Sequence, residues 1–142
     1  MRPIKQVLDG KSRDIISVVP HATVLDALKI LADKDVGALL VMDGDRMVGI
    51  FSERDYARRV VLQGKTSRDT LVRDVMTERI VCLEPSQTVE EAMAMMTEVH
   101  CRHLPVVENG RVIGVVSIGD LVKEIISEQQ FLIQQLETYI TQ

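Results

Sequence analysis

GIFSERD, at Gly49–Asp55, returns with small changes as GVVSIGD at Gly114–Asp120. Each stretch contains a glycine, two apolar residues, a serine and an aspartate three positions after the serine. We expect the glycine to belong to a turn, and the serine to cap a helix by accepting a hydrogen bond from a backbone N–H group at the helix start. The same seven-residue pattern twice in one chain indicates an internal duplication.

The duplication covers most of the chain when positions 65 apart are compared, the spacing between Pro20 and Pro85. The alignment of the two copies needs no gap. Identical residues occur at Ile15 and Ile80, Thr23 and Thr88, Val24 and Val89, Ala27 and Ala92, Leu39 and Leu104, Val41 and Val106, Arg46 and Arg111, Gly49 and Gly114, Ser52 and Ser117, and Asp55 and Asp120. The chain therefore consists of two copies of one unit.

Each copy predicts a strand, a helix, two strands and a helix. The first strands cover 15–19 and 80–83, and a proline follows each, where it ends the hydrogen-bonded ladder. First helices begin after Thr23 and Thr88, which have an acidic residue three positions later, the spacing of a capping box. Two hairpins follow, with the turns DGDR and ENGR joining 38–42 to 47–51 and 104–107 to 112–116. Ser52 and Ser117 begin the second helices.

These elements predict an α+β fold of two β-α-β-β-α repeats packed about a pseudo-two-fold axis, with a cleft between them, because one such unit leaves a sheet face half covered. We place repeat one with its lead-in at 1–62, a polar linker at 63–72, repeat two at 73–126 and a C-terminal amphipathic helix at 127–142. Leu132, Leu136 and Ile140 form one stripe of that helix, with Phe131 beside it. The stripe either folds back on its own module or joins a dimer contact.

Composition argues against two classes of partner. The net charge of −4, the pI near 5.4 and an aromatic content of 3% argue against nucleic acid, which requires clustered cations and stacking surfaces. No uninterrupted apolar run reaches the roughly 18 residues that a membrane span needs. Cys82 and Cys101 are too few for a disulfide framework, and the N-terminus lacks the apolar region of a secretory signal. A cytoplasmic protein is the expectation.

Further motifs carry a family resemblance. They are DVMT at Asp74–Thr77, HLPVV at His103–Val107, and the P-x-x-T-V helix entry at Pro20 and Pro85. Together with both Gly-to-Asp stretches, these make the chain resemble tandem CBS (cystathionine β-synthase) domains, often called a Bateman module, from about Val7 to Ile126. The resemblance implies a regulatory sensor that binds an adenosine-containing ligand, such as AMP, ADP, ATP or NAD, between the repeats. The sequence does not distinguish these ligands from S-adenosylmethionine.

The resemblance also implies the central binding residues. Asp55 and Asp120 would accept hydrogen bonds from ribose hydroxyls, and Ser52 and Ser117 would lie beside ribose or phosphate. The chemistry agrees, because a carboxylate accepts two donors, and a helix N-terminus with a free hydroxyl suits an anion. The alternative is simple helix capping, and the two roles are compatible.

Other residues enter the predicted site by the same resemblance. The first strands would offer backbone groups and apolar side chains to adenine, and Ser12 and Thr77 would offer hydroxyls to ribose or phosphate unless they are ordinary turn hydroxyls. The strand residues that we select are Ile16, Val18, Val81 and Leu83.

The two copies differ where phosphate is expected. Copy two has Arg102 and His103 where copy one has Gly37 and Ala38, and Arg54 in copy one corresponds to Gly119. An Arg guanidinium matches phosphate oxygens well, so the two sites should not be equivalent. The alternative for Arg102 and His103 is a surface or interface role, and Arg58 and Arg59 are interpreted as solvated surface residues.

No catalytic or metal-binding constellation is evident. HCRH at His100–His103 and Cys82 lack the spacing of a structural zinc site. A Walker-type loop, a dinucleotide-binding glycine motif and a nucleophile with a positioned base are all missing, so no enzyme is predicted. We expect a homodimer, as tandem CBS modules commonly form, that signals to a protein effector. A nucleotide-free module for protein interaction or dimerisation is the alternative.

Overall fold

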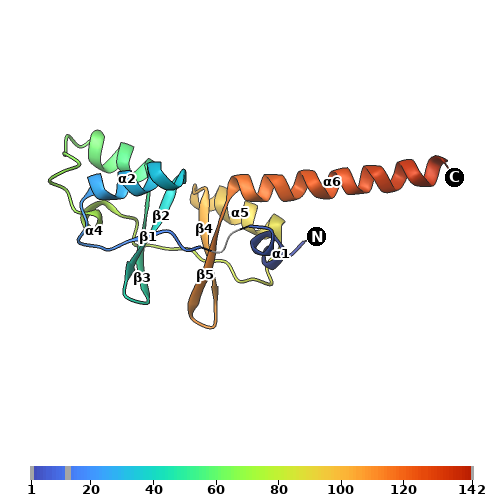
Figure 1. Cartoon of the computed structure of the whole chain (residues 1–142), viewed down its shortest axis with the longest axis horizontal. Helices are drawn as coiled ribbons and strands as arrows, with labels where there is room; N and C mark the ends of the chain where they lie inside the picture. The colour runs from blue at the N-terminus through green and yellow to red at the C-terminus, as the bar shows by residue number, and fades with distance from the viewer. Residues whose placement is uncertain (1, 12–13, 142) are drawn as a thin grey trace. The chain divides into compact units, whose positions relative to one another are not determined.

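A computed structural model describes residues 2–11 and 14–141 of the chain (Figure 1). The chain divides into two compact units: unit 1 comprises Met1–Arg13 with Cys82–Gln142, and unit 2 comprises Asp14–Val81. The residues that precede the first strand of each copy, 1–13 in copy one and 63–81 in copy two, are called its lead-in segment, and each lead-in segment folds with the other copy. The repeat boundaries and the pseudo-two-fold packing remain predictions, whereas the α+β class is confirmed by the elements of both units.

Unit 2 contains a three-stranded sheet in the order β1-β2-β3. Strand β1 (Ser17–Val18) pairs in parallel with β2 (Ala38–Asp43), which pairs antiparallel with β3 (Arg46–Ser52). The predicted first strand at 15–19 is thus shorter, at two residues. The helices of this unit are α2 (Val24–Lys34), α3 (Glu53–Asp55), the π-helix η1 (Tyr56–Val61) and α4 (Val72–Val75).

One face of α2 packs into the core of unit 2. Val24, Ala27 and Leu31 recur at helical spacing and are buried, and they belong to one cluster with Val41 of β2 and Phe51 of β3. Thr23 begins this helix with the predicted capping box, because its side chain accepts a hydrogen bond from Asp26 N–H and the Asp26 carboxylate accepts one from Thr23 N–H. Local capping and apolar spacing thus fix the position of α2 against the sheet.

Unit 1 contains a two-stranded antiparallel sheet of β4 (His103–Glu108) and β5 (Arg111–Ser117), with helices α1 (Ile4–Asp9), α5 (Val89–Val99) and α6 (Ile118–Thr141). The strand predicted at 80–83 is wrong in extent, because only Leu83 pairs, through one parallel bridge to Val106. Leu83 N–H donates to Pro105 O at 2.8 Å, and Leu83 O accepts from Val107 N–H at 2.8 Å.

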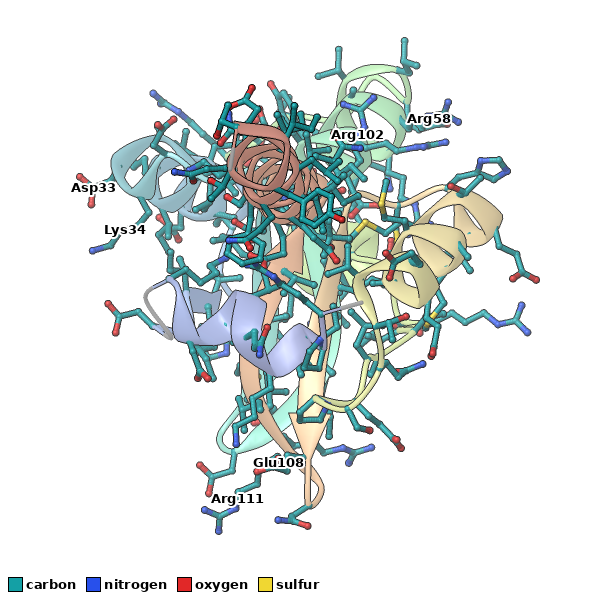
Figure 2. All side chains as sticks on the ribbon, turned by 90° about the vertical axis from the view of Figure 1, so that its right-hand side faces the viewer. Asp33, Lys34, Arg58, Arg102, Glu108 and Arg111 are labelled. Atoms are coloured by element: carbon teal, nitrogen blue, oxygen red, sulfur yellow. The ribbon has the colours of Figure 1, made fainter. Side chains whose placement is uncertain are left out.

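The two hairpins fold alike. Strands β2 and β4 have the same sequence of buried and exposed positions, as do β3 and β5, and both ladders shift register at matching places, after Val41 and after Val106. At the tip of the second hairpin, Glu108 faces Arg111 across the ladder (Figure 2). The turn between them has positive φ at both central residues, 54° and 77°, as type I′ turns require.

The glycines of the repeated stretch lie inside strands and are not turn residues. A Cβ atom on Gly49 would come within 2.5 Å of Met76 Sδ, and one on Gly114 within 2.8 Å of Leu8 Cδ2. Helix α4 packs on β3 and helix α1 packs on β5. The absence of a side chain at each glycine leaves room for the lead-in segment that packs on its strand. Our expectation of turn glycines is therefore wrong, and close approach of a neighbouring segment is the reason for glycine.

Helix α6 begins at the second repeated stretch and continues without a break to Thr141, so the predicted C-terminal helix is its second half. In Figure 1 that half extends well beyond the β4–β5 hairpin of its own unit. The apolar side chains there are exposed: 54% for Leu132, 62% for Leu136 and 78% for Ile140. In the described part of the chain, no helix combines the length and the apolar character needed to cross a membrane.

Candidate functional site

The candidate site of unit 2 forms where β3 ends and α3 begins. Asp55 N–H donates to Ser52 Oγ at 3.2 Å, while Asp55 Oδ2 accepts from Ser52 N–H at 2.9 Å and from the Ser52 hydroxyl at 3.0 Å. These reciprocal bonds form a capping box, and they hold the carboxylate in one orientation at the helix entrance. The cap predicted for Ser52 is confirmed, and its role in ligand contact stays a prediction.

Two more side chains reach the Asp55 carboxylate. The Thr77 hydroxyl donates to Asp55 Oδ1 at 2.9 Å, so Thr77 lies at the capping box, and its contact with ribose or phosphate stays a prediction. Arg59 Nε lies 3.8 Å from the same oxygen, and Arg59 Nη1 donates to Met76 O at 2.7 Å. Arg59 is exposed, as the sequence analysis expected, but it also makes these two contacts, which that interpretation left out. Its spacing of four from Asp55 in the predicted second helix was the available signal.

The candidate site of unit 1 has the same capping box with a different cation. Ser117 N–H donates to Asp120 Oδ2 at 2.8 Å, and Asp120 N–H donates to Ser117 Oγ at 3.1 Å. Lys11, two residues after α1 ends, donates to Asp120 Oδ2 at 2.7 Å and to Val115 O at 2.9 Å. The sequence analysis missed Lys11, and the repeat gave no signal because the matching residue of copy two is Met76.

Opposing effects act on the Asp120 carboxyl. Partial burial raises its pKa, but the hydrogen bonds and charge of Lys11, together with the hydrogen bonds of Ser117, outweigh burial and hold the pKa below the ordinary value. Asp120 is therefore ionised at neutral pH. An ionised carboxylate of this kind is an acceptor for hydroxyl groups.

The starts of β2 and β4 lie against these helix entrances. Glu53 N–H donates to Gly37 O at 3.0 Å, and Ile118 N–H donates to Arg102 O at 2.9 Å. The next residues pair with the serines across each ladder, Ala38 with Ser52 and His103 with Ser117. In each unit the structure therefore gathers the predicted phosphate-end positions around the capping box. The Arg102 side chain is exposed (Figure 2), and so is that of Arg54, one residue before Asp55.

The predicted adenine-contacting residues differ in exposure. Ile16 and Val81 are partly exposed, whereas Val18 is 7% exposed and Leu83 is fully buried. Burial keeps the side chains of Val18 and Leu83 from a ligand, and the N–H and carbonyl of Leu83 are hydrogen-bonded to β4. Ser12 lies outside the described residues.

Among the residues that the structure describes, no three or more His, Cys, Asp or Glu side chains group together. Burial raises the pKa of the Cys82 thiol. Burial also raises that of Cys101, where a backbone hydrogen bond from His103 partly offsets it. Both thiols are therefore protonated at neutral pH, and a protonated thiol is a poor metal ligand.

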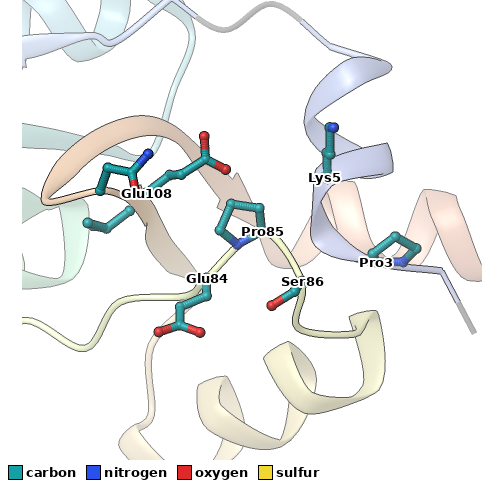
Figure 3. A pocket seen from close by; sticks show the side chains of 8 residues that line it. Pro3, Lys5, Glu84, Pro85, Ser86 and Glu108 are labelled. Carbon is teal, nitrogen blue, oxygen red and sulfur yellow. The ribbon is translucent and has the colours of Figure 1, made fainter.

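An open groove of about 570 Å³ lies elsewhere in unit 1 (Figure 3). It runs between the start of α1, the segment before α5 and the end of β4, and Lys5, Glu84 and Glu108 are its charged residues. None of the predicted binding residues lines this groove. It is therefore separate from the capping boxes Ser52–Asp55 and Ser117–Asp120, which are called the Ser–Asp boxes below.

Comparison with known proteins agrees with this geometry. The family model of the CBS domain matches residues 4–62 and 72–127. A mitochondrial CBS domain-containing protein of Arabidopsis thaliana, CBSX3, is 40% identical over 123 residues, which are 83% of this chain and 60% of that protein. The chain thus spans only part of the length of that relative.

Solved structures have the same fold. A CBS-domain protein from Burkholderia ambifaria MC40-6 has a TM-score of 0.88 at 49% identity, over 90% of this chain and 96% of its own. The CBS domain pair of protein MJ0100, solved in complex with 5′-methylthioadenosine and S-adenosyl-L-methionine, has a TM-score of 0.78 at 23% identity, over 87% of this chain and 99% of its own. The chain belongs to the CBS domain family and carries two CBS repeats.

Proposed function

We propose that this chain is a regulatory sensor that binds an adenosine-containing ligand through Asp55 and Asp120. The observation that carries the proposal is the pair of Ser–Asp boxes, in which an oriented carboxylate stands at a helix entrance in each unit. A carboxylate in this setting can accept both hydroxyls of a ribose, while the nearby cations suit a phosphate. The bound form of the MJ0100 CBS pair supports the adenosine class, since both of its ligands contain that group.

Among adenosine ligands we propose the anionic ones, AMP, ADP, ATP or NAD. Arg59 lies at the first carboxylate and Lys11 at the second, and Arg102 stands at the start of the strand beside Ser117. A nucleotide phosphate would be stabilised by these charges, whereas the positive sulfonium of S-adenosylmethionine would not. We place the ligand between the repeats, as the family resemblance implies.

The proposed output is a change in the activity of a partner protein, without catalysis by this chain. We also propose that the chain is cytoplasmic and forms a homodimer. The location rests on the sparse cysteine content, and the homodimer on the exposed apolar stripe of α6. The identity of the partner would follow from a ligand-dependent pull-down with the purified chain.

The test is a thermal-shift and calorimetric titration with AMP, ADP, ATP, NAD and S-adenosylmethionine, because a ligand that binds only the folded state raises stability by RT ln(1 + [L]/Kd). The double variant Asp55→Ala, Asp120→Ala should bind at least about tenfold more weakly, equivalent to about 1.4 kcal/mol. Asp55→Asn with Asp120→Asn keeps side-chain size and serves if the alanine variant is unstable. Unchanged affinity in a folded variant would remove the proposal.

A second candidate function is a nucleotide-free module for protein interaction. The observation that favours it is the exposed stripe of Leu132, Leu136 and Ile140 on α6. This function predicts no thermal shift with any of the five ligands and unaltered self-association when both aspartates are replaced. Selective binding of one nucleotide with loss on aspartate replacement would exclude it as the sole function.

A further inference from the structure

The two capping boxes obtain their positive charge from different parts of the chain. At Asp55 the cation is Arg59, from the same helical stretch, and it also donates to the carbonyl of Met76 in the lead-in segment. At Asp120 the cation is Lys11, which comes from the lead-in segment itself. The repeat spacing pairs Lys11 with Met76, so an apolar residue replaces this lysine in the other copy.

At the position that corresponds to Arg59, the helix after the second box has a residue of opposite charge. Arg59 corresponds to Glu124 at the repeat spacing, and Glu124 of α6 forms an ion pair with Arg2 of the lead-in. In unit 1 the carboxylates thus lie on α6 and the cations on the lead-in, whereas in unit 2 the helix provides the cation. The box itself is alike in both units, with its carboxylate at the start of the helix, and only the source of the cation differs.

We propose that Lys11 is a specificity-determining residue of the Asp120 site, and that it makes this site select anionic adenosine ligands over uncharged ones. The proposal rests on the proposed function, since it assumes that Asp120 holds a ribose. The ammonium and the carboxylate, 2.7 Å apart, together carry no net charge. Lys11 therefore removes the repulsion that Asp120 would exert on a phosphate.

Distance makes this effect matter for nucleotides. A 5′-phosphate is joined to its own ribose, so it lies within about one Debye length, roughly 8 Å at physiological salt, of a carboxylate that binds that ribose. Without Lys11, the phosphate meets an uncompensated negative charge, which weakens binding. Uncharged adenosine does not experience that repulsion.

Removal of Lys11 should affect adenosine in the opposite direction. Lys11 donates to Asp120 Oδ2, one of the two oxygens that ribose hydroxyls would use. Loss of that donor frees an acceptor for the ligand. The ratio of AMP affinity to adenosine affinity therefore falls whether or not Lys11 stays in place when ligand binds. This ratio is the quantity to measure.

The experiment is calorimetric titration of the full chain with AMP and with adenosine. All variants carry Asp55→Asn, so that binding reports on the Asp120 site. Lys11→Met introduces the residue that stands at the matching position of the other copy. It should lower the affinity ratio by about tenfold, because the interaction energy of two nearby, partly screened charges is of that order. Lys11→Arg keeps the charge and should keep the ratio. Lys123→Met removes an exposed lysine of α6 and is the matched control, with a change below about twofold.

The outcomes separate the two proposals. If Lys11→Met leaves the ratio unchanged while Asp120→Asn abolishes AMP binding, the role of Lys11 is overturned and the sensor function stands. If the unmodified chain binds neither adenosine nor any of AMP, ADP, ATP and NAD, the sensor function fails and the Lys11 proposal fails with it. If it binds ADP, ATP or NAD in place of AMP, that nucleotide replaces AMP in the affinity ratio, with the same expected fall. Circular dichroism checks folding, and Lys11→Gln replaces Lys11→Met if the latter does not fold, with the same expected fall in the ratio.

Discussion

At the scale of single residues, Asp55 and Asp120 show how one repeated position acquires two environments. The Asp55 side chain is 10% exposed and accepts hydrogen bonds from the hydroxyls of Ser52 and Thr77. The Asp120 side chain is 22% exposed and receives an ammonium group. The capping geometry is shared because it depends on residues three apart, whereas the cation is supplied by whichever segment packs nearby.

The lowered pKa of Asp120 predicts an acid-dependent loss of stability. A carboxyl whose pKa is lower in the folded state stabilises the fold above its unfolded pKa, near 3.8, and this contribution is lost as the pH falls through the lower folded value. Asp120→Asn should therefore be less stable than the natural chain at pH 7, and the difference should shrink towards pH 3. Urea unfolding midpoints at pH 7, 5, 4 and 3 measure it.

The control for this prediction replaces Lys11, the residue that donates to Asp120. Lys11→Met should reduce the stability of the natural chain at pH 7 by more than it reduces that of Asp120→Asn, because in the latter the ion pair is already broken and only the Lys11 bond to Val115 O is left to lose. A pH-independent difference between Asp120→Asn and the natural chain would show that Asp120 acts only as a neutral cap.

At the scale of elements, the two strand glycines govern how lead-in segments pack. Helices α4 and α1 cross β3 and β5 at points where a side chain would collide with Met76 or Leu8. The lead-in segments carry Thr77 and Lys11 to the boxes, so the close packing at the glycines also places site residues. Glycine in the repeated stretch therefore supports the site indirectly, because it leaves room for the lead-in segment that carries a site residue.

Gly49→Ala should destabilise the chain by about 1–3 kcal/mol, the usual cost of overpacking a filled core. The new Cβ would lie 2.5 Å from Met76 Sδ and 3.1 Å from the backbone oxygen of Thr77, which has little room to move. Gly119→Ala is the matched control, because its Cβ meets nothing closer than Ser117 Oγ at 3.6 Å, and it should change stability by less than about 1 kcal/mol. Denaturant unfolding of both variants gives the comparison, and equal midpoints would contradict the packing argument.

At the scale of the whole molecule, α6 presents apolar residues that unit 1 does not cover. The exposed side chains at its C-terminal half include Phe131 at 54% and Tyr139 at 80%. Long helices in water gain most of their stability from packing of an apolar face. Pairing of α6 with a second copy of the chain would provide that packing.

Leu132→Glu with Leu136→Glu should therefore shift the chain from dimer to monomer, since two charges would enter the proposed contact. Gln130→Glu with Gln134→Glu adds the same charge at the same spacing on exposed polar positions of α6 and should leave the dimer intact. Sedimentation velocity over a concentration series distinguishes the two states. A monomeric natural chain, or a leucine double variant that remains dimeric, would exclude α6 as the dimer contact.

The sequence by itself determined the duplication, the α+β class, both hairpins and the caps at Thr23, Ser52 and Ser117. Each depends on residues close together in the chain or on the constant spacing of 65. The short pairing at Leu83, the role of Gly49 and the assignment of Lys11 were decided only by the tertiary structure. Lys11 and Asp120 are 109 positions apart, and contacts over such a separation depend on how segments pack rather than on local pattern.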